Sequence, residues 1–285
     1  MTGEFDREEF DRLAGEFRYV MTDMMYRAGS GHLGGAMSLT EIVITLYWRI
    51  MKHDPANPKW QERDRLVLSK GHAGPVLYVA LAYRGFYDKK LLGTLNADGT
   101  MLPSHVDRLR TPGIDMTAGS LGQGLSAACG LAMAGRIRRQ DHDVFCIIGD
   151  GESNEGMIWE AAMFAGNRKL DNLVAICDYN HLQIDGTTEE VMDLEPLADK
   201  WRAFNWEVME MDGHDWDDIH QTIERAKAVE GKPTMILAHT IKARDCSVLE
   251  GLPESHNIKV PDREARDKYM SALRLQDYRL PYEDE

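Results

Sequence analysis

The stretch Val144-Phe-Cys-Ile-Ile-Gly-Asp-Gly-Glu-Ser-Asn-Glu-Gly156 decides the fold of this 285-residue chain. Its apolar start, Val144–Ile148, is too short for a helix and is bounded by charge and glycine, which is typical of a buried strand. Asp150 follows at the carboxyl end of that strand, between two glycines that let a ligand approach the backbone closely. The stretch therefore predicts a strand that presents a carboxylate to a ligand.

Strands and helices alternate on the carboxyl-terminal side of this stretch. Apolar runs at Leu173–Cys177, Trp206–Met211 and Thr234–Thr240 predict strands, and helical patterns at Trp159–Ala165 and Trp216–Val229 lie between them. Strands separated by helices predict βαβ units and a mostly parallel sheet that is covered by helices on both faces. We therefore expect a three-layer, doubly wound α/β fold, in which ligands bind outside the carboxyl ends of the strands.

The amino-terminal side of the stretch contains further predicted elements. Apolar residues at helical spacing predict a helix over Phe10–Ala28, and Ser38-Leu-Thr-Glu41 predicts a capping box before the apolar run Ile42–Met51. Arg65–Leu68 is a further strand candidate, and an alanine-rich helix is expected over Val76–Arg84. These elements are expected to join the same sheet and its covering layers.

No repeat, low-complexity tract or linker divides the sequence. We expect a single domain over residues 1–285, with a peripheral N-terminal helix and a peripheral C-terminal tail. The tail, Val260–Glu285, is expected to be a polar helix followed by acidic residues.

Composition and charge exclude several classes of protein. The 33 Lys and Arg against 47 Asp and Glu give a net charge of −14, which argues against a nucleic-acid partner. No apolar run reaches the roughly 18–20 residues that cross a bilayer, so we expect no membrane association. The acidic N-terminus is unlike a signal peptide, and the four cysteines form no CxxC pair. A reduced, cytoplasmic setting is therefore predicted.

A metal site is predicted where two of the strands end. Asn180 follows the strand at Leu173–Cys177 and lies thirty positions after Asp150. A carboxylate, an amide oxygen and a nearby backbone carbonyl form the open, hard-oxygen set that Mg²⁺ prefers, and Ca²⁺ or Mn²⁺ would fit the same set. The alternative is that Gly149-Asp-Gly151 is an ordinary turn and Asn180 a loop residue.

These residues resemble the motif of thiamine-diphosphate enzymes. The continuation Gly149-Asp-Gly-Glu-Ser-Asn-Glu-Gly-Met-Ile-Trp-Glu-Ala161 is similar to transketolases in particular. Ser30-Gly-His32, Leu68-Ser-Lys-Gly-His72 and Thr117-Ala-Gly-Ser-Leu-Gly-Gln-Gly124 agree with that family. The resemblance runs from about Phe10 to His256, yet it covers only the amino-terminal half of a full-length transketolase. It implies the thiamine-diphosphate-binding fold, here as the pyrophosphate-binding domain of a split, two-chain enzyme.

The resemblance also implies roles for individual residues. The metal would be held by Asp150, Asn180 and the backbone carbonyl of Leu182. His32, His105 and His256 would bind donor hydroxyls and relay protons, with near-neutral pKa values suited to acid–base work. The residues implied in cofactor binding are His72, Gly119, Ser120, Leu121, Gly151, Glu155, Asn180 and Lys242. The other six histidines are interpreted as structural or surface residues.

Glu155 matches the family pattern, whereas two short segments depart from it. Glu155 resembles the family's acidic residue at the dimer contact, although it would also serve as a helix N-terminal charge. The family commonly has Trp-His-Gly where this chain has Ser255-His-Asn257, and Lys-Gly-Lys-Gly where it has Lys242-Ala-Arg-Asp245. Arg244 is either a surface charge or a contact to an anionic substrate. These departures leave the substrate more open than the cofactor.

The implied reaction is transfer of a two-carbon ketol unit from a ketose donor, expected to be a sugar phosphate, to an aldose acceptor. The glutamate that activates the cofactor lies in the family's pyrimidine-binding domain, which this chain lacks. The resemblance therefore implies a chain that is active only with a pyrimidine-binding partner subunit, in an α2β2 assembly. The alternatives are a subunit like deoxyxylulose-phosphate synthase or keto-acid dehydrogenase, and a non-catalytic, cofactor-binding regulator.

Overall fold

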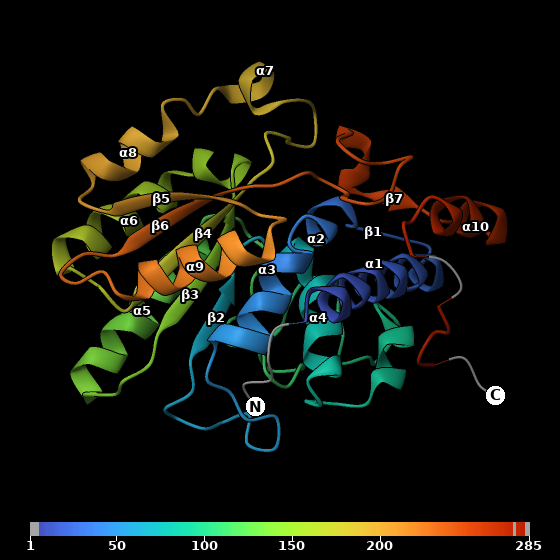
Figure 1. Ribbon diagram of the computed structural model, residues 1–285, viewed down its shortest axis with the longest axis horizontal. Helices are drawn as coiled ribbons and strands as arrows, with labels where there is room; N and C mark the ends of the chain where they lie inside the picture. The colour runs from blue at the N-terminus through green and yellow to red at the C-terminus, as the bar shows by residue number, and fades with distance from the viewer. Residues whose placement is uncertain (1–5, 276–277, 283–285) are drawn as a thin grey trace.

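The apolar runs in the sequence form adjacent strands of one sheet. The computed structural model describes residues 6–275 and 278–282, and within them five strands pair in parallel in the order β2-β3-β4-β6-β5 (Figure 1). The strands are β2 Arg65–Leu68, β3 Val144–Gly149, β4 Leu173–Tyr179, β5 Glu207–Asp212 and β6 Thr234–His239. Each predicted strand is thus present, with ends that differ by no more than two residues.

Both faces of the sheet are buried. Along β3, Phe145 and Ile147 contribute to one hydrophobic cluster, whereas Cys146 and Ile148 contribute to the other. A strand that is apolar on both faces needs cover on both sides, because successive side chains point in opposite directions. Helices supply that cover, which confirms the expected three-layer, doubly wound α/β fold.

Different sets of helices cover the two faces. The first cluster is built from residues of α1 Arg7–Ala28, α3 Thr40–Thr45, α4 Gly74–Tyr83 and α9 Trp216–Lys227. The second is built from residues of α5 Gln123–Arg138, α6 Gly156–Arg168 and α8 Leu197–Ala203. The shorter elements are β1 Ser30–Gly31, α2 Gly34–Met37, η1 Leu46–Ile50, η2 Gly71–Ala73, η3 Lys89–Thr94, η4 Gly151–Asn154, α7 Thr188–Met192, η5 Pro253–His256, β7 Ile258–Lys259 and α10 Arg263–Ser271.

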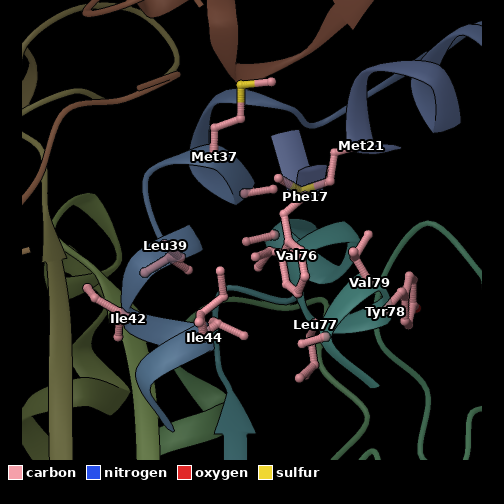
Figure 2. Packing of buried hydrophobic residues seen from close by; sticks show 14 of the residues in the cluster. Phe17, Met21, Met37, Leu39, Ile42, Ile44, Val76, Leu77, Tyr78 and Val79 are labelled. Atoms are coloured by element: carbon pink, nitrogen blue, oxygen red, sulfur yellow. The ribbon is translucent and has the colours of Figure 1, made fainter. Parts of the chain in front are cut away.

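The N-terminal helix is part of the core rather than peripheral. Phe17 and Met21 of α1 are fully buried and lie close to Val76 of α4 in the first cluster (Figure 2). The helix α10 packs against α1, and Leu280 beyond it is also buried. The expectation of a peripheral N-terminal helix is therefore wrong. Most described residues of the tail are exposed or half-buried, and its acidic end at 283–285 lies outside the described residues.

The predicted capping box does not form. The residue before α3 is Leu39, and the Ser38 hydroxyl donates instead to the Asp178 carboxylate in β4, at 2.7 Å. Glu41 accepts two hydrogen bonds from Arg18, at 2.6 and 2.9 Å. Both side chains that a capping box would use therefore form hydrogen bonds with other parts of the fold instead.

No helix within the described ranges is both long and apolar enough to cross a membrane. All four cysteines of the sequence are buried and free, as expected for small core residues.

Candidate active site at the carboxyl edge of the sheet

Three strands deliver their following loops to the same edge of the sheet. Gly149 pairs with Asp178, and Tyr179 pairs with His239, so β3, β4 and β6 end at neighbouring positions. In a parallel sheet this carboxyl edge is where ligands bind. A cavity of about 340 Å³ lies there, which is within the range of small-molecule sites.

The cavity gathers eleven of the thirteen predicted site residues. Ser120 and Glu155 are exposed and do not line it, and Glu155 lies beside Gly122 instead. Arg244 does not line it either, and its guanidinium lies 3.5 Å from the Glu250 carboxylate. The predicted residues that line it are His32, His72, His105, Gly119, Leu121, Asp150, Gly151, Asn180, Leu182, Lys242 and His256. The lining residues that sequence reasoning missed are Gly35, Lys70, Gly149, Glu152, Gln183, Ile184 and Asp185.

The predicted metal ligands lie on two adjacent loops. Asp150 accepts backbone hydrogen bonds from Gly151 at 2.7 Å and from His181 at 2.6 Å, which fix its carboxylate. The Asn180 side-chain oxygen accepts from the Leu182 amide at 3.1 Å. Within the described ranges no three His, Cys, Asp or Glu side chains gather into a metal site, so a metal here would depend on this mixed oxygen set.

Ionisation of the Asp150 side chain is unfavourable while no cation is bound. Burial and, next, the charge of Asp178 raise its pKa to about 6. Asp178 is fully buried, and its carboxylate accepts from the Lys70 ammonium and the hydroxyls of Ser38 and Thr240. Burial opposes ionisation of Asp178, but Lys70 and these hydrogen bonds outweigh it and lower its pKa. Asp178 therefore stays charged and leaves Asp150 in a negative field.

Five buried charged side chains surround this end of the cavity. They are Lys70, Asp150, Glu152, Asp178 and Lys242, each 3% exposed or less. Three carboxylates against two ammonium groups give an excess of one negative charge. An anion such as a diphosphate is repelled by that balance, whereas a divalent cation at Asp150 would reverse its sign. The donor set and the charge balance both fit a metal-assisted diphosphate site.

The side of the cavity that carries these charged residues, here called the charged wall, also offers space and hydrogen-bond donors for an anion. Lys242 donates to the carbonyls of Leu182 and Gln183, at 3.3 and 3.2 Å, and the Gln183 amide nitrogen is buried without a partner among the described residues. A Cβ at Gly151 would lie 2.8 Å from the Gln183 side chain, and one at Gly35 would lie 3.1 Å from the Lys70 ammonium. The two glycines thus keep space open in front of these donors.

Burial and, next, the charge of Lys70 lower the pKa of Lys242 to about 8. The nearby carboxylates act in the opposite direction, and the ammonium remains mostly charged at pH 7.

Glu152 holds the loops around the cavity together. Its carboxylate accepts from the Ser69 hydroxyl, from the Gly122 amide at 2.9 Å and from the Gly149 amide at 3.0 Å. It thereby joins the ends of β2 and β3 to the start of α5. Its position two residues after Asp150 was visible in the sequence, but its partners were not.

Four histidines from four segments meet in the same cavity, and His72 lies near Lys70. The ring centre of His32 lies 5.3 Å from that of His72, 5.5 Å from that of His105 and 5.2 Å from that of His256. Burial is the first cause that lowers the pKa of each, with neighbouring positive charge contributing at His72 and His256; the pKa of His256 falls to about 3. For His32 and His105 the pKa thus lies below that of a free histidine. The cluster is neutral at pH 7.

Comparison with known proteins identifies relatives of this arrangement. A family profile described as "Transketolase, thiamine diphosphate binding domain" matches residues 10–271. The chain is 55% identical over 249 residues to the 6-deoxy-6-sulfo-D-fructose transketolase subunit SqwG of Clostridium sp. (strain MSTE9), covering 87% of this chain and 90% of that protein. It is 42% identical over 257 residues to an apulose-4-phosphate transketolase subunit of Phocaeicola vulgatus, covering 90% of each.

Solved structures agree with these relatives. The transketolase of Campylobacter jejuni matches with a TM-score of 0.87 at 34% identity, over 94% of this chain and 43% of that one. The chain thus spans less than half of that solved enzyme, although it spans nearly all of the two subunits above. The cavity, the matched profile and the shared fold lead to one conclusion: the chain belongs to the transketolase family and carries its thiamine diphosphate-binding domain.

Proposed function

We propose that this chain is the cofactor-binding subunit of a two-chain transketolase, which moves a two-carbon ketol unit from a ketose to an aldose. The observation that carries the proposal is the cavity, where an oxygen-ligand set, two buried ammonium groups and four histidines surround one space. Two relatives of similar length are named transketolase subunits, which supports an enzyme divided between chains.

The metal and diphosphate would lie against the charged wall. Asp150, Asn180 and the Leu182 carbonyl would hold Mg²⁺, or Ca²⁺ or Mn²⁺ in its place. Thiamine diphosphate, when bound, supplies a nucleophilic carbon that no side chain of this chain provides. The buried ammonium groups of Lys70 and Lys242 would neutralise charge on the diphosphate.

The histidines would bind the hydroxyl groups of the sugar and exchange protons with them. A neutral imidazole has one N–H donor and one acceptor nitrogen, so it can hold a hydroxyl group and take its proton. We assign this role to His32, His105 and His256, which line the cavity, and a cofactor contact to His72. The low pKa of His256 keeps its ring neutral at pH 7 and suits it to hydrogen bonding with a hydroxyl rather than to taking a proton.

The partner subunit would supply the pyrimidine-binding domain in an α2β2 assembly. Met157, Met163 and Phe164 of α6 are exposed by 39%, 59% and 41%, which is unusual for three large apolar side chains on one short helix. Glu155 immediately precedes the same helix and is also exposed. We propose that this face of α6 is covered by another subunit, which is also where the family resemblance put Glu155.

The donor would be a ketose that carries an anionic group. The two relatives are named for 6-deoxy-6-sulfo-D-fructose and for apulose-4-phosphate, one a sulfonate and the other a phosphate. We extend this class to the present chain without choosing between the two anions. The proposal includes a cytoplasmic location, because four free buried thiols suit a reducing compartment.

The test is ketol transfer with thiamine diphosphate, Mg²⁺ and a donor panel of phosphorylated and sulfonated ketoses. The chain is assayed alone and together with a pyrimidine-binding transketolase subunit. We expect product only in the mixture. Transfer by the chain alone would contradict the divided site, and binding of the cofactor without transfer across the panel would favour a regulator.

A histidine variant separates the sugar side from the cofactor side. His32→Ala in the mixture should leave the Kd for thiamine diphosphate unchanged and lower kcat by at least about 100-fold, the usual effect of losing a general acid–base group. His239→Gln is the matched control, since His239 is exposed and outside the cavity. Equal kcat values in the two variants would show that His32 has no catalytic role.

A further inference from the structure

The loop after β6 carries Lys242 into the cavity in an unusual backbone conformation. Ala243 and Asp245 have φ values of 57° and 63°, in the left-handed region that favours glycine. Most residues with a Cβ lose about 1–2 kcal/mol there, and Asp tolerates the region better than Ala does. The sequence resemblance pairs these same two positions with glycines of the family. Something in this chain must therefore hold the loop.

A buried ion pair lies directly behind the loop. Arg18 of α1 is 2% exposed, and its guanidinium contacts the Glu41 carboxylate of α3 at 2.6 Å. The same guanidinium contacts the Asp245 carboxylate at 3.1 Å. The far end of the loop is thus attached to α1 by a charged contact that glycine could not make.

The near end of the loop is attached to the same ion pair through His214. The Ile241 amide donates to His214 Nε2 at 2.8 Å, so Nε2 is the unprotonated nitrogen. Nδ1 then carries the proton and donates to Glu41 at 3.1 Å. His214 belongs to the Asp212–Asp215 turn and is only 10% exposed. Lys242 lies between the two attachments.

We propose that His214 and Asp245 are positioning residues that fix this loop so that Lys242 faces the diphosphate. The inference rests on the proposed function, since Lys242 is their point of action. Neither side chain lines the cavity, so each acts on the ligand only through the loop. The backbone adds a third contact, because the Ala243 amide donates to the Gly34 carbonyl at 3.0 Å.

A pair of variants isolates the hydrogen bond from Ile241. Asn at position 214 can replace the Nδ1 donor toward Glu41 but has no acceptor at the Nε2 position, whereas Gln places an oxygen near it. We expect His214→Asn to weaken thiamine diphosphate binding about tenfold, roughly 1.4 kcal/mol, and His214→Gln to restore most of it. The Kd is measured by calorimetry with Mg²⁺ on the full chain with its partner. Asp245→Asn, which tolerates the left-handed backbone, should weaken binding from the other end of the loop.

A double-mutant cycle distinguishes positioning from general destabilisation. In a Lys242→Met background, His214→Asn should change the Kd by less than about twofold. Asp215→Ala is the control, because it removes the N-terminal cap of α9 in the same turn without touching the loop. It should lower the melting temperature and leave the Kd unchanged. An undiminished effect of His214→Asn in the Lys242→Met background would overturn the proposal.

Hydrogen exchange of the cofactor-free chain gives an independent reading. The Ile241 amide should exchange faster in His214→Asn than in His214→Gln, and equal rates would overturn the attachment. The two proposals fail differently. A wild-type chain that binds no thiamine diphosphate refutes the function, whereas normal binding with an additive cycle refutes only the positioning role.

Discussion

The Asp150 carboxylate is buried next to Asp178, and its pKa of about 6 lies above the value of a free aspartate. A raised folded pKa means that the proton stabilises the fold, and this stability is lost as the pH rises from about 4 through 6. At pH 7 the ionised group therefore costs the metal-free chain roughly 3 kcal/mol. A bound cation would remove that cost.

Asp150→Asn should abolish Mg²⁺-dependent binding of thiamine diphosphate, with a loss of at least about 100-fold in affinity, because a neutral amide neither attracts the cation nor offers two oxygens. Titration of cofactor at fixed Mg²⁺ measures the loss. Asp185→Asn is the control on the exposed rim of the same cavity and should stay within a few-fold of wild type. Similar affinities for the two variants would contradict the metal assignment.

At the scale of elements, the residue that precedes α5 is a glycine that its surroundings require. Gly122 has a φ of 85°, and a Cβ there would lie 2.8 Å from that of Glu155. Its amide donates to Glu152, which connects α5 to β3. Gly130, about two turns later and inside α5, has nothing within 4 Å of an added Cβ. Gly122 and Gly130 therefore have opposite expected responses to alanine.

Gly122→Ala should lower the free energy of unfolding by about 2 kcal/mol or more, since it combines backbone strain with a steric clash. Gly130→Ala should raise it by about 0.5–1 kcal/mol, because alanine is the better helix former. Urea unfolding of the chain without a partner measures both. A destabilised Gly130→Ala variant would contradict the open surroundings of that position.

Helices and strands could be predicted from the sequence where residues that are neighbours in the chain determine them. The run Val144–Ile148 forms β3 because a short apolar segment between glycine and charge has few alternatives, and Asp150 follows from it. The capping box at Ser38 failed because that hydroxyl binds Asp178, 140 positions away. Lys70 and Glu152 were missed for the same reason, since their partners lie 108 and 83 positions along the chain. Ser120 and Glu155 matched a motif, yet the cavity does not include them.

At the scale of the whole molecule, one buried ion pair connects three parts of the fold. Arg18 and Glu41 join α1 to α3 and, through Asp245 and His214, to the loop after β6. Burial would raise the pKa of Glu41, but Arg18 and His214 outweigh it and lower the pKa to about 2. A lowered folded pKa means stability that is present above about pH 4.5 and lost as the pH falls through 2.

Glu41→Gln should lower the free energy of unfolding at pH 7 by roughly 3 kcal/mol, because Arg18 would keep its burial and be left with Asp245 as its remaining carboxylate partner. The difference from wild type should shrink as the pH falls from 4.5 toward 2, where Glu41 also loses its charge. Urea unfolding across that range is the measurement, with Glu224→Gln on the surface of α9 as control. A pH-independent difference would refute the ionic contribution of the pair.

The excess negative charge around the cavity would make the proposed cation and diphosphate dependent on each other. A cation would raise the affinity for diphosphate, and by thermodynamic reciprocity diphosphate would raise the affinity for the cation by the same factor. Neither ligand alone is then expected to saturate the chain. The fraction of chain with bound cofactor would then depend on the free concentrations of both Mg²⁺ and thiamine diphosphate. A fall in either concentration would lower that fraction.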